Sequence, residues 1–147
     1  MESIIRCAQA EDVTRLECFL EEAKLSVEGI QSSIENFLIM ENHLGDIKAT
    51  LGIETLGKLG LLRSLVMRSE TAERDLFILF EQMLMLARDR QLESIYLASN
   101  KKNSFEFFRL LGFTEEAASH LPEALLESQH VKHILAVDNS FFLKLSI

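Results

Sequence analysis

The sequence has few residues that break or staple a chain: one proline, six glycines, two cysteines and no tryptophan among 147 residues. No glycine- or serine-rich linker, low-complexity tract or internal repeat divides it, which predicts a single domain over residues 1–147. It also lacks a run of about 18 apolar residues, which argues against a membrane-spanning helix. No basic segment followed by a long apolar run opens the chain, so the sequence predicts no secretory signal.

Positive charge is scarce as well. Lysine and arginine number 15 against 23 aspartates and glutamates, a formal net charge of −8. This balance argues against partners that need a basic face, namely nucleic acids and anionic membrane surfaces. The charge is uneven, however: residues 1–57 carry −7, residues 58–109 carry +2 and residues 110–147 carry −3. The middle third is therefore the segment that suits an anionic ligand.

The two cysteines, Cys7 and Cys18, both lie in apolar patterns near the N-terminus. Without a secretory signal, cysteines in such patterns are expected to be reduced and buried. The sequence therefore predicts a cytoplasmic protein with no disulfide.

Apolar spacing predicts strands in both halves of the chain but regular alternation with helices only in the second half. The strongest helix spans residues 72–90, where apolar side chains are so dense that the helix must be largely buried against a sheet. This order predicts an α+β fold with a mixed sheet. The predicted strands cover residues 3–8, 37–40, 47–55, 60–67 and 94–98 and a strand-rich tail over 134–147, and the other predicted helices cover 10–25, 29 or 32 to 36, and 105–111.

Four short motifs follow one another along most of the chain. They are Leu-Leu-Arg-Ser-Leu at 61–65 before the long helix, Tyr-Leu at 96–97, Phe-Phe-Arg-Leu-Leu-Gly-Phe at 107–113, and Leu-Pro at 121–122. In this order the chain resembles the GNAT superfamily of acyl-CoA-dependent N-acetyltransferases. It looks most similar to the single-domain branch that is like the acetyltransferase part of N-acetylglutamate synthase.

The resemblance implies a GNAT-like mixed sheet of about six to seven strands flanked by about four helices, with acetyl-CoA as the co-substrate. The pyrophosphate would lie at the N-terminus of the 72–90 helix, a position that suits an anion on physical grounds. The pantetheine arm would bond to the backbone of the preceding strand, whose N–H groups would also stabilise the oxyanion of the reaction. The implied cofactor-binding residues are Leu65, Val66, Met67, Arg74, Asp75, Leu76, Phe77 and Phe108.

The segment that would hold the pyrophosphate departs from the family pattern. Arg74 matches, but Glu73, Asp75 and Phe77 stand where the family has glycines. Glycine matters there because a missing Cβ lets the backbone approach a phosphate closely. Carboxylates would also repel the phosphates, although they suit the dipole of a helix start. An ordinary acidic helix start is therefore the alternative interpretation.

The groups that many family members use for catalysis are also replaced. Leu61 stands at the position of a glutamate base, and Phe108 at the position of a tyrosine that protonates the leaving thiolate. A thiol with a pKa of about 8.5 leaves readily as the thiolate, even without an acid to protonate it. No catalytic residue is assigned from the sequence.

Arg63 and Ser64 are the predicted acceptor-binding residues, since the strand that carries them would line the acceptor cleft. Arg63 would hold a substrate carboxylate through two parallel hydrogen bonds, as an amino-acid-like acceptor requires. The alternative for Arg63 is a pair with a surface glutamate.

Two further pairs of residues have ordinary alternatives. His130 and His133 have the spacing of two metal ligands on one helix face, but no third ligand is near, so surface histidines and no metal are expected. Lys101 and Lys102 lie near the expected nucleotide end of the cofactor, and a solvated basic turn is the alternative.

Three aromatic residues also have two interpretations. Tyr96, the only tyrosine, is expected to pack in the core rather than act as an acid. Phe141 and Phe142 are expected to pack on the sheet, and an exposed ring there would instead form a homodimer contact.

Two hypotheses about function follow from the sequence. The first is an N-acetyltransferase that moves an acetyl group from acetyl-CoA to a primary amine of a small, amino-acid-like acceptor by direct transfer. The second is a catalytically inactive GNAT-fold module that binds a ligand or a protein partner, favoured by the missing glycines at Glu73, Asp75 and Phe77.

Overall fold

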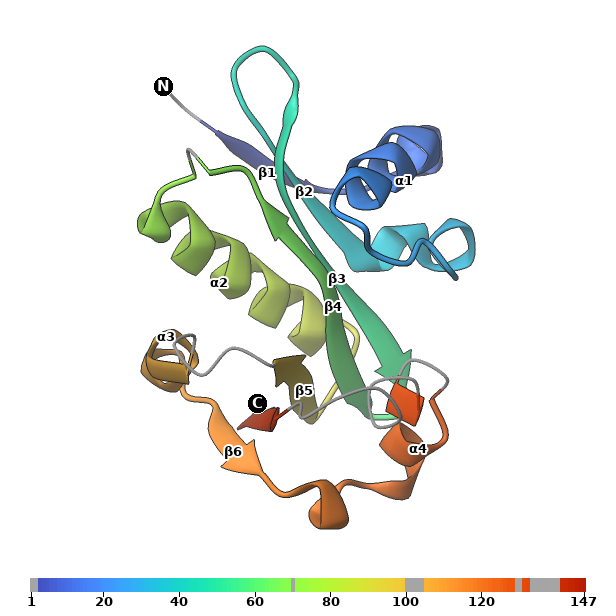
Figure 1. Cartoon of the computed structure of the whole chain (residues 1–147), viewed down its shortest axis with the longest axis vertical. Helices are drawn as coiled ribbons and strands as arrows, with labels where there is room; N and C mark the ends of the chain where they lie inside the picture. Colours follow the sequence, from blue (N-terminus) through green and yellow to red (C-terminus); the bar gives the residue numbers. More distant parts are fainter. Residues whose placement is uncertain (1–2, 70, 100–104, 129–130, 133–140) are drawn as a thin grey trace. The chain divides into compact units, whose positions relative to one another are not determined.

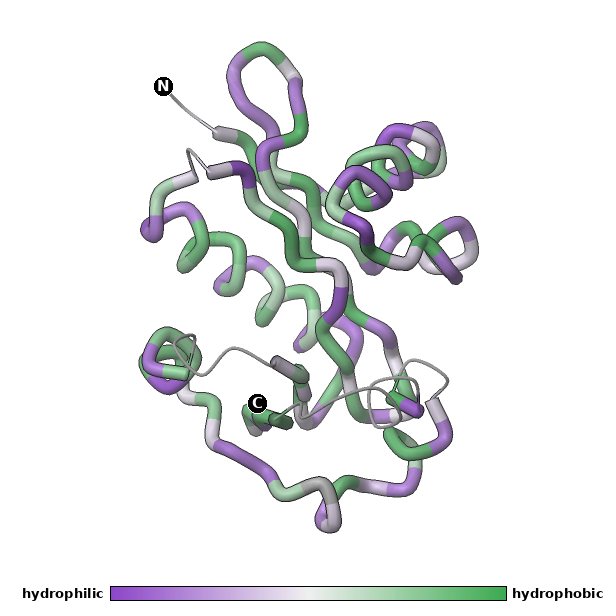
Figure 2. Tube along the Cα trace, viewed as in Figure 1, coloured by the Kyte–Doolittle hydropathy of each residue, from purple (hydrophilic) through white to green (hydrophobic). Residues whose placement is uncertain are grey.

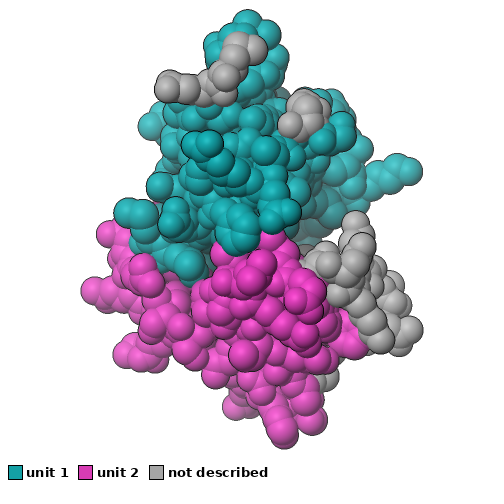
Figure 3. All heavy atoms as spheres, turned by 90° about the vertical axis from the view of Figure 1, so that its left-hand side faces the viewer, with its two compact units in different colours: residues 1–54, 63–86 teal, residues 55–62, 87–147 magenta. Residues whose placement is uncertain are grey.

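A computed structural model describes residues 3–69, 71–99, 105–128, 131–132 and 141–147. Seven strands form one sheet in the order β1-β2-β3-β4-β5-β7-β6. β4 and β5 run parallel, whereas β1–β2, β2–β3, β5–β7 and β6–β7 are antiparallel pairs. The predicted α+β class and mixed sheet are therefore confirmed. The chain divides into two compact units, unit 1 with residues 1–54 and 63–86 and unit 2 with residues 55–62 and 87–147 (Figure 3).

Unit 1 is built around an antiparallel meander. Its strands are β1 (Ile4–Cys7), β2 (Phe37–Glu41) and most of β3 (Ile47–Leu56), and the later half of β4 (Leu59–Met67) also belongs to it. Short helical segments connect β1 to β2, namely η1 (Ala10–Asp12), α1 (Val13–Glu22) and η2 (Gln31–Asn36). Figure 1 shows α1 and η2 on one side of these strands and the first turns of α2 (Glu73–Asp89) on the other.

Both helices of unit 1 follow from the spacing of their apolar residues. Leu16 and Leu20 of α1 are one turn apart, are fully buried and pack on Phe37 and Ile39 of β2. Along α2, hydrophobic residues recur through successive turns (Figure 2), and Leu79, Phe80, Met83 and Leu86 are buried. The dense apolar pattern of residues 72–90 thus produces the buried helix that it predicts.

Unit 2 is built on the other end of the strand order. β5 (Ser94–Ser99) pairs with β7 (Phe141–Ser146), β7 pairs with β6 (Thr114–Glu116), and the first residues of β4 pair with β5. Within the described residues this unit also contains the helical segments α3 (Phe105–Leu110), η4 (Ala118–His120) and α4 (Glu123–Leu126). Its core includes Leu61, Tyr96, Leu121, Leu125, Val131 and Phe142.

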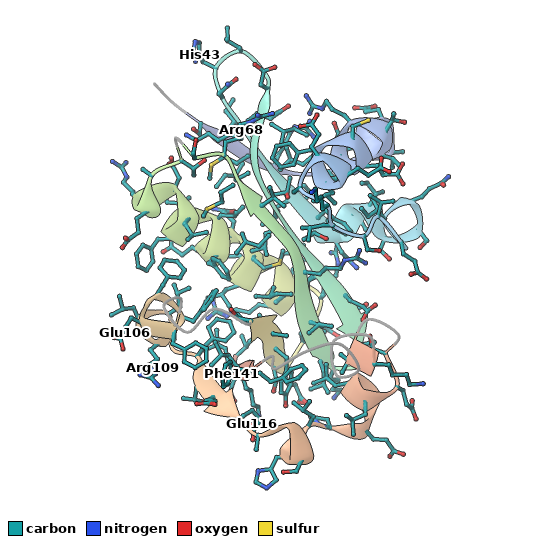
Figure 4. All side chains as sticks on the ribbon, viewed as in Figure 1. His43, Arg68, Glu106, Arg109, Glu116 and Phe141 are labelled. Carbon is teal, nitrogen blue, oxygen red and sulfur yellow. The ribbon has the colours of Figure 1, made fainter. Side chains whose placement is uncertain are left out.

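The aromatic residues of unit 2 pack as predicted for core residues. Tyr96 is 2% exposed and Phe142 is 2% exposed. The Phe141 ring meets the Phe105 ring edge-on, with centroids 5.3 Å apart. Figure 4 labels Phe141 together with Arg109, whose guanidinium lies over the Phe105 ring. Phe142 therefore packs in the core as predicted, whereas the half-buried Phe141 ring contacts Phe105 of α3.

Two features of the fold differ from the prediction. β6 and α4 were missed because three- and four-residue elements carry too little periodicity to be seen in a sequence. Cys7 and Cys18 are both free and exposed, so the prediction that they are buried is wrong. Cys7 lies on β1 at the edge of the sheet, and Cys18 lies on α1 between buried positions 16 and 20, on the outer face.

In the described part of the chain, no helix has the length and hydrophobicity needed to cross a membrane.

A network of four charged side chains fastens the start of unit 1. Arg6 on β1 makes two hydrogen bonds to Asp12, of 2.8 and 2.9 Å, and contacts Glu41 of β2 at 2.9 Å. Arg15 of α1 contacts Glu41 at 2.7 Å and donates to the carbonyl of Gly45 in the β2–β3 turn. Each arginine of the network contacts a carboxylate on another element. The network therefore links β1, α1, β2 and the β2–β3 turn.

The end of α2 predicts a stabilising substitution. Gln91 has a φ of +62°, and Leu92 donates to the carbonyl of Ala87, which together form a Schellman cap. Glycine adopts this φ without the steric cost of a side chain, so Gln91→Gly should raise the free energy of unfolding by about 1 kcal/mol, or Tm by about 3 °C. Thermal unfolding measures the change. Arg88→Gly, one turn earlier inside the helix, should lower Tm by a similar amount; a lower Tm for Gln91→Gly would contradict the assigned cap.

Candidate functional site

β4 carries one more residue than the stretch of β3 beside it. β3 ends at Leu56 and β4 begins at Leu59, so a two-residue turn joins them. Farther along, the N–H of Arg68 donates to the carbonyl of Lys48 over 2.9 Å. Arg68 lies nine residues after Leu59, the first residue of β4, whereas Lys48 lies eight residues before Leu56, the last residue of β3. Since such bonds join directly opposed residues in an antiparallel pair, β4 contains a one-residue bulge.

The bulge lies at Ser64, which has a φ of +58°. This left-handed conformation costs a non-glycine residue about 1–2 kcal/mol. The neighbouring side chains agree with an extra residue here. The Arg63 guanidinium lies over the Phe37 ring, and Val66 packs against the apolar cluster that contains Phe37. Residues three apart on a regular strand point to opposite faces, so the bulge is what brings both to one face.

Thr50 of β3 holds the bulge from the neighbouring strand. Its hydroxyl donates to the carbonyl of Ser64 over 2.9 Å, and its side chain is fully buried. A backbone carbonyl that loses its ladder partner at a bulge needs another donor. The Thr50 hydroxyl therefore takes the place of a backbone donor.

Arg63 is hydrogen-bonded to the segment that connects α1 to η2. One terminal nitrogen donates to the carbonyl of Glu28 at 2.9 Å, the other to the carbonyl of Ser26 at 3.4 Å, and Nε donates to the Ser64 hydroxyl at 3.2 Å. Burial lowers the pKa of Arg63, and the nearby negative charges of Glu54 and Glu28 oppose that shift. An arginine remains protonated at neutral pH all the same. Arg63 thus fixes the 26–28 segment beside the bulge.

The segment between β4 and α2 is braced by the start of β3. Besides its backbone bond to Lys48, Arg68 donates from Nε to the carbonyl of Ile47 at 2.7 Å. Its guanidinium lies 5.2 Å from the centre of the Phe19 ring (Arg68 is labelled in Figure 4). The Thr71 hydroxyl also donates to the Lys48 carbonyl at 3.4 Å. These contacts fix the position from which α2 begins.

The first turn of α2 carries the three charged residues that the sequence singles out, Glu73, Arg74 and Asp75. Lys48 Nζ lies 3.0 Å from a carboxylate oxygen of Asp75 and 2.7 Å from the hydroxyl of Ser3. The negative charge of Asp75 is therefore balanced within unit 1, whereas Glu73 and Arg74 are exposed. The N–H groups of Asp75 and Leu76 both donate to the carbonyl of Ala72.

The remaining residues predicted to bind the cofactor lie in two different units. Leu65 and Val66 on β4 and Phe77 on α2 are half-buried in unit 1, and Met67 is 39% exposed. Phe108 lies in unit 2 on α3, is 7% exposed, and meets the rings of Phe107 and Phe113 edge-on.

No acid or base is found where the resemblance places one. Leu61 is fully buried among the apolar residues of unit 2, and Phe108 is surrounded by aromatic rings. His130, His133, Lys101 and Lys102 lie outside the described residues. Among the residues that are described, no group of three or more His, Cys, Asp and Glu side chains could hold a metal ion.

An open hollow of about 600 Å³ lies beside the segment that Arg63 holds. Val27 and Gly29 contribute to it from that segment, and its other lining residues are Glu17, Gln31 and Ser32. The hollow is too open to define a ligand, but its position depends on Arg63.

Sequence reasoning missed two residues that this geometry brings forward, Thr50 and Lys48. Thr50 is a single polar residue between Ala49 and Leu51 in a buried strand, and that isolated hydroxyl was the available signal. Lys48 gave no signal, because its partner Asp75 lies on a different element.

Comparisons with known proteins agree with this architecture. No protein-family model matches the chain. The uncharacterised protein YwlB of Bacillus subtilis is 36% identical over 127 residues, which cover 86% of this chain and 85% of YwlB.

Three solved structures have the same fold. Rv2747 of Mycobacterium tuberculosis, solved with CoA, has a TM-score of 0.78 at 17% identity over 98% of this chain and 99% of its own. N-acetylglutamate synthase of Neisseria gonorrhoeae, solved with CoA and N-acetyl-glutamate, has a TM-score of 0.77 at 21% identity over 99% of this chain, which spans 35% of that enzyme. A GNAT-family acetyltransferase of Staphylococcus aureus has a TM-score of 0.74 at 19% identity over 97% of this chain and 98% of its own. The chain thus belongs to the same family as YwlB, and its fold is that of the GNAT acetyltransferases.

Proposed function

We propose that this protein binds acetyl-CoA and transfers the acetyl group to a primary amine of a small, amino-acid-like acceptor. The observation that carries the proposal is the left-handed backbone conformation of Ser64, which lies in the middle of β4, the strand that precedes α2. Strained backbone of this kind persists where the surrounding structure enforces it, which is typical of functional sites. Solved proteins with this fold, Rv2747 and N-acetylglutamate synthase, are CoA complexes, which supports the same class of ligand here.

The start of α2 supplies the groups for the pyrophosphate. The N–H groups of Glu73 and Arg74 lie in the first turn, where a helix has no partner of its own for them, and the helix dipole favours an anion. The Arg74 side chain is exposed in the same turn and would add a charge-assisted bond. Asp75 does not oppose this arrangement with a full charge, because Lys48 is paired with it at 3.0 Å.

The backbone after the bulge supplies the groups for the reaction. In direct transfer the neutral amine nitrogen attacks the thioester carbonyl carbon, so a C–N bond forms and the oxygen becomes negative. N–H groups among Leu65 to Met67 would stabilise that oxygen, because a bulge leaves a residue of the strand without its ladder partner. The C–S bond then breaks, CoA leaves as a thiolate, and the surplus proton of the nitrogen passes to solvent or to the thiolate. This sequence needs no side-chain acid, which suits the apolar Leu61 and Phe108.

Arg63 and Ser64 remain the proposed acceptor-binding residues. An acceptor carboxylate would share the Arg63 guanidinium with the carbonyls of Ser26 and Glu28, at donor distances of 3.4 and 2.9 Å. The longer bond is the one that an acceptor would replace most readily. This geometry favours an acceptor with a carboxylate close to its amine.

The second candidate is a GNAT-fold module that binds a ligand without transferring an acetyl group. Two observations favour it: the apolar surroundings of Leu61 and Phe108, and the regular helix that replaces a glycine-rich loop at Glu73. The two candidates differ in a single assay, because only the first consumes acetyl-CoA when amines are supplied.

Replacing Arg74 tests where the pyrophosphate binds. Arg74→Ala should weaken the binding of CoA about tenfold or more, because a charge-assisted hydrogen bond is lost. Isothermal titration with CoA measures the change at constant ionic strength. Arg88→Ala makes the same substitution at the other end of α2 and should leave the affinity within about twofold. Equal affinities for wild type and Arg74→Ala would show that the pyrophosphate lies elsewhere.

A further inference from the structure

We infer that Thr50 is a positioning residue for the acetyl-CoA site, because its hydroxyl holds Ser64 in the left-handed conformation. The inference rests on the proposed function. It concerns a side chain on β3 that is not among the proposed cofactor- or acceptor-binding residues, and that acts through the backbone of β4.

The first support is the geometry of the contact. Thr50 Oγ1 lies 2.9 Å from the Ser64 carbonyl, an ordinary distance for a strong bond, and Thr50 is fully buried. Because Thr50 is 0% exposed, its hydroxyl must find a partner inside the protein, and the Ser64 carbonyl is that partner. The bond therefore exists only while Ser64 keeps its carbonyl turned toward β3.

The second support is the way in which Thr50 itself is held. It lies opposite Ile39 in the β2–β3 ladder, between Ala49 and Leu51, whose side chains are buried. Threonine is branched at Cβ, so its side chain has little rotational freedom in a strand. Thr50 is thus a rigid donor within a buried stretch of the sheet of unit 1.

The third support is the absence of an intrinsic preference at Ser64. Serine does not favour a positive φ as glycine does, so the conformation depends on its neighbours. Ser64 receives a hydrogen bond from Thr50 at its carbonyl and one from Arg63 Nε, 3.2 Å away, at its hydroxyl. The Thr50 bond acts on the backbone, and it is the one that fixes the direction of the peptide leading to Leu65.

The consequence concerns the N–H groups that follow. The carbonyl of Ser64 and the N–H of Leu65 belong to the same planar peptide. The direction of this N–H is therefore fixed only while the Ser64 carbonyl is held. Donors that stabilise an oxyanion or bind a pantetheine amide must be fixed before the ligand arrives. Removing the Thr50 hydroxyl should therefore weaken CoA binding without unfolding the sheet.

The test compares Thr50→Val with Thr50→Ser. Valine keeps the shape of threonine and removes the donor, whereas serine keeps the donor. We expect Thr50→Val to weaken CoA binding at least fivefold in isothermal titration, and to speed amide hydrogen exchange at Leu65 to Met67 at least fivefold relative to α1. Thr50→Ser should stay within about twofold of wild type in both. Thr55→Val, the same change at an exposed position of β3, is the matched control.

Each outcome decides something different. If wild type binds CoA and Thr50→Val binds it equally well, Thr50 has no positioning role, and the proposed function stands. If wild type shows no CoA binding at millimolar concentration, the proposed function fails, and the role of Thr50 fails with it. If Thr50→Val does not fold, the double variant Thr50→Val/Ser64→Gly replaces it, since glycine adopts a positive φ freely. That double variant should then fold, and amide exchange at Leu65 to Met67 should be at least fivefold faster than in Ser64→Gly alone; equal exchange in these two variants would overturn the inference.

Discussion

Gly52→Ala should destabilise the protein by about 3 kcal/mol, because the new methyl group would collide with a buried aromatic ring. A Cβ built at Gly52 would lie 2.5 Å from Cδ2 and 3.0 Å from Cζ of Phe37, its cross-strand partner. The Phe37 ring is 1% exposed and lies beneath the Arg63 guanidinium, so it has no free space into which to move. Urea unfolding measures the loss.

Two further variants separate the collision from other effects of the change. Gly45→Ala, at a positive φ with no atom within 4 Å of the new Cβ, should cost only about 1 kcal/mol. Phe37→Leu should be destabilising alone but should relieve the collision, so the Gly52→Ala/Phe37→Leu double variant should be more stable than the sum of the single changes predicts. Strict additivity would show that Gly52 and Phe37 do not compete for space.

Asp12→Asn should lower the free energy of unfolding by about 3 kcal/mol. Asp12 is 5% exposed, receives two hydrogen bonds from Arg6, and accepts one from the N–H of Gln9. The hydrogen bonds from Arg6 lower the pKa of the Asp12 carboxyl from 3.8 to about 2, and the Gln9 bond acts in the same direction. The pKa shift corresponds to about 2 kcal/mol that is lost with the negative charge, and a donor left without an acceptor at this buried position accounts for the remainder.

The same carboxylate predicts an acid-dependent loss of stability. Because the pKa of Asp12 is lower in the folded state, its contribution is complete above about pH 4 and is lost as the pH falls toward 2. Glu41, whose pKa Arg6 also lowers, adds to the loss in the same direction. Urea unfolding of wild type between pH 5 and 2.5 should show this decline, and Asp12→Asn should show a smaller one.

A matched control for Asp12 lies at the neighbouring position. Glu11 is exposed in the same turn, so Glu11→Gln should change the stability by less than about 0.5 kcal/mol and leave the pH dependence intact. An Asp12→Asn variant as stable as Glu11→Gln would show that the network around Arg6 contributes little.

The regular parts of the fold could be predicted from the sequence, because each element has its own periodicity. The strands around Phe37 and Ile47 and the long helix from Glu73 appear within one or two residues of their predicted ends. Their patterns are local, so the sequence contains the whole signal. The tail strand is observed over Phe141–Ser146, and residues 134–140 of the prediction lie outside the described residues.

The candidate site could be predicted only in part, because its important contacts join distant positions. Arg63 and Ser64 were identified from their motif, but the left-handed conformation of Ser64 depends on Thr50, on the neighbouring strand. Likewise, the expectation that Asp75 would repel phosphate considered the helix start alone, and its partner Lys48 lies on β3. Pairings of this kind depend on strand register, which a single sequence does not reveal.

The most direct test of the proposed function is isothermal titration calorimetry of the purified 147-residue chain with acetyl-CoA. We expect saturable binding of one acetyl-CoA per chain, with a dissociation constant of about 100 μM or lower, within the ordinary range of KM values for enzymes. Binding should also raise Tm as the ligand concentration increases. No heat of binding and no change in Tm at millimolar acetyl-CoA would contradict the account.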